Sequence, residues 1–393
     1  SGLDPSWQIA LGLLRDKVGV WGQDFVFSYG PLGSYIYRLP IGVQSWQQFL
    51  YDAFFFANLI YFHATCFPPK AKNYHVLIFL VFNLFSFEMM GESSTFLWMF
   101  LGMYHGVVAL KSTKRWVQAI SIWMSFILLG IIFFTKANYG MIVWAFLAGL
   151  LVLMTIQKKI KWWQLVGLIC GFSGVLILWS SFLQTDLLAY FQTSLHIIAN
   201  YNAGMSVFPE GFKFMTAVTY LLFVLQILWT IYWLVEKDDQ TLSDFFLVIL
   251  GLGISFLLLK YSFLRADSGH LTAYVKLITY VGILLIARVT SIYIRRFYYV
   301  LLPFVFVLYV SLYVPIVGFT PLGIMHGIKY RPFIIAHYLW GQDAKVLNPK
   351  IPKLPLLFLN RIKNQSVDII PYELSYAYTY RLNYRPRPTL QSY

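Results

Sequence analysis

The feature that most constrains this chain is a series of long apolar runs across its first 317 residues. Most of these runs contain about 18–24 residues, and a helix needs about 20 apolar residues to cross the ~30 Å hydrocarbon core of a bilayer. Two runs, 75–87 and 96–110, are shorter and could form one pair of tilted or half-buried helices. The sequence therefore predicts ten spanning segments, at 49–66, 75–87, 96–110, 117–134, 139–156, 163–183, 213–235, 244–263, 270–288 and 298–317.

The composition indicates the same fold class. Of the 393 residues, 59% are hydrophobic and only 12% are charged, whereas a soluble domain carries about 25% charged residues. Polar side chains could not cover the surface of such a chain, so it needs lipid as its solvent. We predict an all-α polytopic protein of the cytoplasmic membrane, with about ten transmembrane helices.

Positive charge is concentrated in every second loop between the apolar runs, and this pattern predicts the orientation of the chain. The positive-inside rule places such loops in the cytoplasm. The acidic loop 236–244 falls on the same side and is the exception, but acidic residues carry little weight in setting orientation. The net charge of +14 is therefore explained by orientation and by anionic lipid headgroups rather than by nucleic acid. The basic loop residues are Lys70, Lys72, Lys111, Lys114, Arg115, Lys158, Lys159, Lys161, Arg288, Arg295 and Arg296.

The remaining loops are then extracytoplasmic, and they divide the chain into three parts. Residues 1–48 form a first outer loop with amphipathic helices, 49–317 form the transmembrane bundle, and 318–393 begin a small extracytoplasmic α/β domain. In this last part we expect a strand at 367–370 and a helix from Pro371 to Asn383. The other outer loops are 85–95, 135–138, 184–212 and 261–270.

Four acidic residues on the predicted outer side are candidates for chemistry. Asp4 is the candidate catalytic base, because a carboxylate near the top of a helix bundle can take a proton from an acceptor hydroxyl; alternatively, it caps a helix that begins at Pro5. Asp24 either assists an acceptor or a metal, or closes a turn. Glu88 and Glu92 share a helix face and could order an acceptor, hold a divalent cation (Mg²⁺ or Mn²⁺), or be solvated loop acids.

Three basic residues on the same side are candidates for binding a lipid phosphate. Lys136 lies in a short outer loop, against the positive-inside trend, and either a substrate phosphate or an ordinary lipid headgroup would satisfy it. Arg265 can hold a phosphate through two parallel hydrogen bonds or pair with Asp267. His270 could add a donor, whereas His196 is expected to be structural.

Several other classes of protein find no support in the sequence. No Cys/His cluster has zinc spacing, no glycine-rich segment has the lysine of a phosphate-binding loop, and no Gly-x-Ser-x-Gly elbow occurs. Few ionisable residues lie within the apolar runs, which disfavours an ion-coupled transporter. We expect the site at the outer membrane interface.

The overall pattern resembles the GT-C superfamily of glycosyltransferases. The similarity lies in an acidic residue within a large first outer loop, followed by many hydrophobic helices and a C-terminal extracytoplasmic domain. Bacterial membrane proteins of this type carry similar short segments, although an adjacent pair of acids in the first loop is missing here. The matching segments are Leu3-Asp4-Pro5-Ser6-Trp7, Phe27-Ser28-Tyr29-Gly30-Pro31-Leu32-Gly33 and Arg387-Pro388-Thr389-Leu390-Gln391-Ser392-Tyr393.

The resemblance implies transfer of a sugar from a polyprenyl-phosphate donor to a hydroxyl of a glycan, lipid or protein acceptor. Asp4 would act as base in a single displacement that inverts the anomeric centre. Lys136, Arg265 and His270 would stabilise the departing lipid phosphate, and a divalent cation between Asp4 and Glu92 is conceivable. Two alternatives remain open, a lipid or glycan transporter and a non-catalytic scaffold of an envelope complex.

Overall fold

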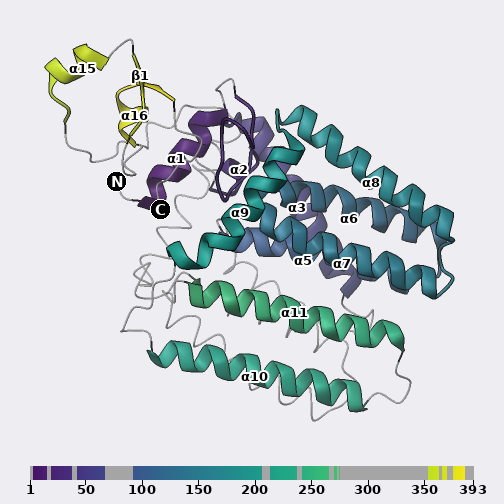
Figure 1. The fold of residues 1–393 in the computed structure, drawn as a ribbon. Helices are drawn as coiled ribbons and strands as arrows, with labels where there is room; N and C mark the ends of the chain where they lie inside the picture. Colours follow the sequence, from purple (N-terminus) through teal and green to yellow (C-terminus); the bar gives the residue numbers. More distant parts are fainter. Residues whose placement is uncertain are drawn as a thin grey trace.

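The computed structural model describes about two thirds of the chain, and this part is mostly helical (Figure 1). Of the predicted spans, 75–87, 298–317 and nearly all of 270–288 lie outside the described residues, as do Glu88 and Arg265. The described residues are 3–15, 19–37, 42–66, 92–205, 213–236, 241–264, 270–271, 274, 353–362, 365–369 and 375–385.

Four consecutive helices form the best-packed part of the molecule. They are α5 (Glu92–Lys111), α6 (Arg115–Thr135), α7 (Ala137–Ile156) and α8 (Trp162–Phe182). Short turns connect them, so neighbours run antiparallel, side by side in Figure 1. Helix α6 packs closely against α7 because Gly140 has no side chain, and a Cβ there would overlap the backbone of Phe133.

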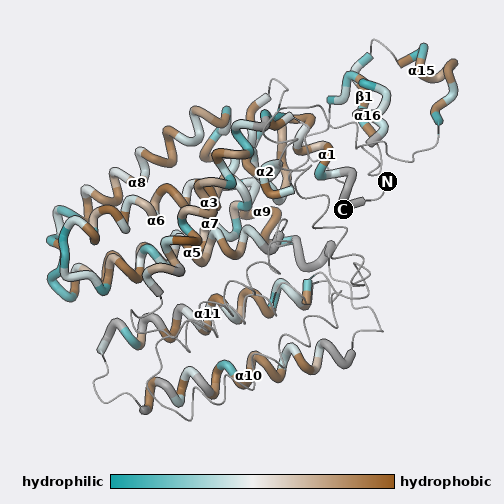
Figure 2. Tube along the Cα trace, turned by 180° about the vertical axis from the view of Figure 1, so that it is seen from behind, coloured by the Kyte–Doolittle hydropathy of each residue, from teal (hydrophilic) through white to brown (hydrophobic). Residues whose placement is uncertain are grey.

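Among the described helices, α6, α7 and α8 are long and apolar enough to cross a membrane. Their outer faces carry many exposed large hydrophobic residues, and Figure 2 shows the hydrophobic colouring along these helices. The structure therefore supports a helical membrane protein. The number of ten spans and the side that faces the cytoplasm stay predictions.

The other predicted spans that the structure describes are also helical. They correspond to α3 (Ser45–Cys66), α10 (Lys213–Glu236) and α11 (Leu242–Leu264). The segment 184–212, predicted as a loop, contains a further helix, α9 (Leu187–Met205). Asp186 starts this helix, since its Oδ1 accepts the backbone N–H of Ala189 at 2.9 Å, as an N-cap residue does.

The N-terminal segment, residues 3–37, folds over one end of the bundle. Helix α1 (Leu3–Arg15) buries Trp7, Leu11 and Leu14 on one face, the i, i+4, i+7 spacing of an amphipathic helix. Protein rather than a membrane surface covers this face, because it packs in one core with Phe27 and Tyr29. Short helix α2 (Ser34–Tyr37) follows the turn that begins at Gly30, where the N–H of Gly33 donates to the carbonyl of Gly30 at 2.9 Å.

The C-terminal part differs from the prediction in its helices and in the bounds of its strand, because the strand found, β1, ends at Val367 and residues 368–369 lie outside it. The expected helix from Pro371 to Asn383 is wrong at its end, because α16 (Ser375–Thr379) stops earlier and Asn383 lies in strand β2 (Asn383–Tyr384). β2 pairs in parallel with β1 (Ser366–Val367), so strand pairing replaces helix in this region. Helix α15 (Leu356–Ile362) was not predicted. Ala377 and Tyr384 are buried against helix α1.

The described loops lie at the two ends of the bundle. At one end, the basic turn 157–161 reaches the end of α5, where Lys159 Nζ donates to the carbonyl of Leu110. At the other end, the N-terminal segment meets the α6–α7 junction and the α8–α9 turn. The N–H of Gly30 donates to the carbonyl of Thr135, and the N–H of Trp21 donates to the carbonyl of Gln184. Among the described residues, the basic loops 112–114 and 157–161 therefore lie at the end opposite the N-terminal segment.

Candidate functional site

The candidate site lies where the N-terminal segment meets the helix bundle. The N–H groups of Gly30 and Leu32 donate to the carbonyls of Thr135 and Phe134 at 3.0 and 2.9 Å. These bonds use carbonyls at the end of α6, which have no partner within a helix. Gly30 is required there, because a Cβ would overlap the Tyr190 hydroxyl and the Phe134 carbonyl. The backbone itself thus holds the segment against the bundle.

A cavity of about 360 Å³ opens at this junction. The N-terminal segment, the α6–α7 junction, and helices α7, α9 and α11 all contribute to its walls. One part of the lining is polar or cationic and the rest is aliphatic, so the cavity matches an amphipathic ligand. Its lining residues are Phe27, Ser28, Lys136, Ala137, Asn138, Tyr139, Met141, Ile142, Ser194, Leu195, Ile197, Ile198, Leu257, Lys260 and Tyr261.

Lys136 is the most deeply placed charge in this cavity, with 3% of its surface exposed. It links α6 to α7 in an extended conformation, with φ −153° and ψ 102°. Its Nζ donates to the hydroxyl of Tyr29 at 3.2 Å. The ammonium also lies 4.4 Å from the Tyr29 ring centroid, 5.1 Å from that of Tyr139 and 5.7 Å from that of Tyr261. Aromatic faces attract a cation, so three rings from distant segments hold this ammonium at the cavity.

Lys260 on α11 lines the same cavity and was not singled out by the sequence. It lies inside the apolar run 244–263, near the end predicted to be extracytoplasmic. The sequence signal that could have identified Lys260 was a lysine at the predicted extracytoplasmic end of a span, where the positive-inside rule disfavours positive charge. Two lysines, one in the α6–α7 junction and one on α11, make this cavity suited to an anionic group.

The structure brings part of the predicted phosphate-binding set together. The ring of Tyr261, 5.7 Å from the Lys136 ammonium, lies 4.9 Å from the His270 ring between centroids. Lys136 and His270 therefore share one aromatic neighbour. Arg265 lies outside the described residues, so its predicted role is not tested. His196, predicted to be a satisfied structural histidine, is exposed on α9.

The predicted acidic residues are placed less completely. Helix α1 begins at Leu3, so Asp4 lies in its first turn rather than at its N-cap, and Glu92 is the first residue of α5; neither side chain is described. Asp24 is exposed and closes a turn, because its Oδ2 accepts the N–H of Val20 at 2.8 Å. Within the described residues, no group of three or more His, Cys, Asp or Glu residues could hold a metal ion. The divalent-cation prediction stays untested.

A side-chain contact also holds the N-terminal segment to the α8–α9 turn. Gln23 Nε2 donates to Asp186 Oδ2 at 2.5 Å. The N–H of Ala189, followed by the Gln23 amide, lowers the pKa of Asp186, and burial partly opposes this shift. The hydrogen bonds therefore favour a charged Asp186 that anchors both α9 and the segment.

Arg15, at the end of α1, forms a second polar contact that sequence reasoning missed. Its Nη2 donates to the Tyr35 hydroxyl and, at 2.9 Å, to Gln47 Oε1 on α3. The guanidinium lies 4.3 Å from the Tyr35 ring centroid. Burial raises the pKa of Tyr35, and the positive charge of Arg15 partly opposes this shift. This contact positions α1 and α2 over α3.

Comparison with known proteins leaves the cavity as the basis for a functional conclusion. No protein-family model, curated protein or solved structure matches this chain. The chemistry that the site itself offers is a pair of lysines, several hydroxyl and amide groups, and an aliphatic wall. This combination suits a phosphate carried on a lipid.

Proposed function

We propose that this protein is a membrane glycosyltransferase of the GT-C type that uses a sugar on a polyprenyl phosphate as its donor. The observation that carries the proposal is the cavity at the junction of the N-terminal segment and the bundle, with Lys136 and Lys260 in its wall. The donor's phosphate would lie beside these lysines. The acceptor is a hydroxyl of a glycan, lipid or protein on the extracytoplasmic side.

The lining of the cavity divides in a way that fits such a donor. Ser28, Asn138 and Tyr139 offer hydrogen-bonding groups near Lys136, whereas Ile142 and Leu257 offer hydrocarbon. A phosphate group and the first isoprene units would each find a matching surface. A soluble sugar nucleotide would leave the aliphatic wall without a partner.

The reaction needs a base and a stabiliser of the leaving group. In the proposal, Asp4 takes the proton of the acceptor hydroxyl while that oxygen attacks the anomeric carbon. The bond between the anomeric carbon and the phosphate oxygen breaks, and the electron pair goes to the phosphate. Lys136 stabilises the developing charge from a position with little water, where such interactions are strong. A single displacement inverts the anomeric centre.

The proposal is tested by sugar transfer in vesicles that contain the purified protein and a radiolabelled polyprenyl-phosphate sugar. Replacing Lys136 by Met keeps the volume and removes the charge, and we expect transfer to fall by about 10²–10³-fold, as for other lost stabilisers of a leaving charge. Lys114→Met, an exposed lysine at the opposite end of the bundle, is the matched control.

Two results would contradict the proposal. Full transfer by a folded Lys136→Met protein would remove Lys136 from the reaction, and full transfer by Asp4→Asn would remove the assigned base. Movement of intact lipid across the vesicle membrane without any product would instead favour a transporter.

A further inference from the structure

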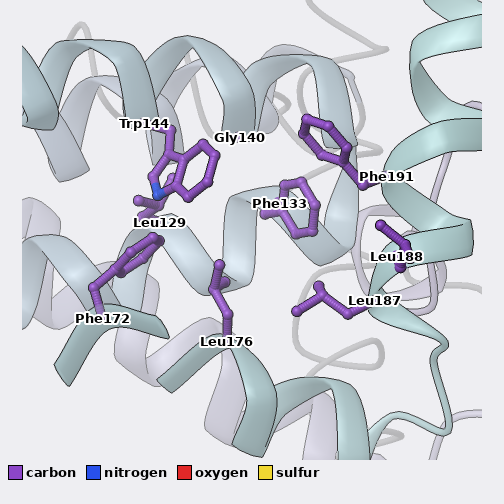
Figure 3. Close-up of a pocket in the computed structure, with 9 residues that line it drawn as sticks. All are labelled: Leu129, Phe133, Gly140, Trp144, Phe172, Leu176, Leu187, Leu188 and Phe191. Atoms are coloured by element: carbon purple, nitrogen blue, oxygen red, sulfur yellow. The ribbon is translucent and has the colours of Figure 1, made fainter. Parts of the chain in front are cut away.

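A second cavity, of about 300 Å³, opens among helices α6, α7, α8 and α9 (Figure 3). Every lining residue is hydrophobic or glycine, so the walls offer almost nothing to a polar ligand. In the figure the side chains of Trp144 and Phe172 lie together at one end of the space, with Leu176 beside Phe172 and with Phe133 and Phe191 further along. The lining residues are Leu129, Phe133, Gly140, Trp144, Phe172, Leu176, Leu187, Leu188 and Phe191.

The cavity has a buried floor and an exposed mouth. Leu129 and Leu176 are 1% and 8% exposed, whereas Trp144 and Leu188 are 44% and 68% exposed. Three of the four helices around the cavity, α6, α7 and α8, are long and apolar enough to cross a membrane. Leu178, two residues from Leu176 on α8, is 72% exposed. In a bilayer, the side of the mouth at Trp144, between membrane-long helices, therefore faces hydrocarbon, and Leu188 lies next to the α8–α9 turn.

This cavity is separate from the one that contains the lysines. Helix α7 contributes Gly140 and Trp144 here but Met141 and Ile142 there. Helix α9 contributes its first turn, 187–191, here and its next turns, 194–198, there. Because α7 and α9 pack against each other, they divide the two spaces. An occupant of the apolar cavity does not depend on the proposed function.

We propose that the apolar cavity binds an acyl chain of a membrane phospholipid, with the headgroup left outside. An apolar protein cavity of about 150 Å³ stays dry and takes up benzene. Twice that volume has room for on the order of ten to twelve carbon atoms. The acyl chain gives the side chains at the floor of the cavity dispersion contacts that they would lack if the cavity were empty. Phospholipid is chosen over the donor's prenyl tail because the lysines lie on the other side of α7 and α9.

The proposal is tested by photo-crosslinking. The full-length protein is reconstituted in phosphatidylcholine vesicles that contain a trace of phosphatidylcholine with a diazirine on one acyl chain. After illumination, crosslinked residues are located by peptide mass spectrometry. We expect crosslinks at Trp144, Leu176 and Leu188, and we expect unlabelled phosphatidylcholine to compete for them.

Two variants close the cavity from different places, and one serves as a control. Leu188→Trp narrows the mouth at an exposed position, and Leu176→Trp fills the floor; each should lower these crosslinks by about tenfold. Leu178→Trp places the same side chain on the outer face of α8 and should leave them unchanged. The exposed position of Leu188 keeps the test valid if Leu176→Trp fails to fold.

Three outcomes would overturn the assignment. Crosslinks spread evenly along the outer face of α8 would indicate ordinary surrounding lipid. Unchanged crosslinks in Leu188→Trp would show that the acyl chain does not enter the cavity through this mouth. Displacement of the label by polyprenyl phosphate, but not by phosphatidylcholine, would assign the cavity to the prenyl tail.

Discussion

At the scale of single residues, Lys136 carries most of the functional argument. A buried ammonium is costly unless other groups replace its water. Here the Tyr29 hydroxyl accepts one hydrogen bond, and the rings of Tyr29, Tyr139 and Tyr261 lie within 6 Å of the charge. The lysine is held in place before any ligand arrives. Such preorganisation is what stabilisation of a leaving group requires.

Asp186 makes a prediction about pH at the same scale. Its pKa in the fold is below the ordinary value of 3.8, so its contribution to stability is present above that value. The contribution is lost as the pH falls through the lower, folded pKa. We expect Asp186→Ala to have a lower melting temperature than the wild type at pH 7, and the difference should shrink below about pH 4.

The check is a thermal denaturation series from pH 3 to pH 7 on both proteins. A difference in melting temperature that stays constant to pH 3 would mean that the charge of Asp186 does not stabilise the fold. If the two proteins had equal melting temperatures near neutral pH, the charge of Asp186 would likewise not stabilise the fold.

Sequence alone found part of this site for a clear reason. Lys136 is a lone charge in a short loop between two apolar runs, and such a residue needs a partner. Its partners could not be predicted, because Tyr29 lies 107 positions away and local patterns do not report such contacts. Lys260 was missed because it lies within an apolar run, and its neighbours hid its position at the cavity.

At the scale of elements, the contact between the N-terminal segment and α6 depends on Gly30. Gly30→Ala should destabilise the protein by about 1–3 kcal/mol, since the added Cβ would overlap the Phe134 carbonyl and the Tyr190 hydroxyl. That hydroxyl cannot move freely, because it donates to the carbonyl of Phe133 at 3.1 Å. Backbone hydrogen exchange across residues 20–37 should also become faster.

Gly174→Ala on α8 is the matched control, because a Cβ there meets nothing within 4 Å. Alanine has a higher helix propensity than glycine, so this variant should be at least as stable as the wild type. Equal stability and exchange in Gly30→Ala and the wild type would show that the segment is not held at this contact.

The helices were predictable where their sequences are long and apolar, as for α6, α7 and α8. Helix α9 was not predicted because polar residues interrupt its apolar pattern, although Asp186 is a recognisable start signal. The helix predicted to end at Asn383 stops at Thr379 instead, because residues 383–384 pair with 366–367. Pairing between distant segments overrides local preference.

At the scale of the whole molecule, the two ends of the bundle carry different chemistry. The end with Lys114 and the turn 157–161 is basic, and the other end holds the N-terminal segment and the lysine-lined cavity. Figure 2 shows the α7–α8 turn coloured as hydrophilic beside the apolar helices. The positive-inside rule predicts that this basic end is cytoplasmic.

Cysteine labelling in intact cells tests that orientation. With Cys66 and Cys170 replaced by Ala, Thr113→Cys should react with an impermeant maleimide only after the cells are opened. Gln23→Cys, at the opposite end and exposed, should react from outside. The reverse pattern would place the candidate site in the cytoplasm and contradict the proposed donor geometry.

The most direct test of the central claim is binding of a fluorescent polyprenyl monophosphate to the purified protein. A charge-assisted hydrogen bond contributes about 1.5–3 kcal/mol, so Lys136→Met should raise Kd by roughly 10- to 100-fold. Lys260→Met should also raise it, and Lys114→Met should leave it unchanged. Equal Kd values for the wild type and a folded Lys136→Met protein would contradict the account.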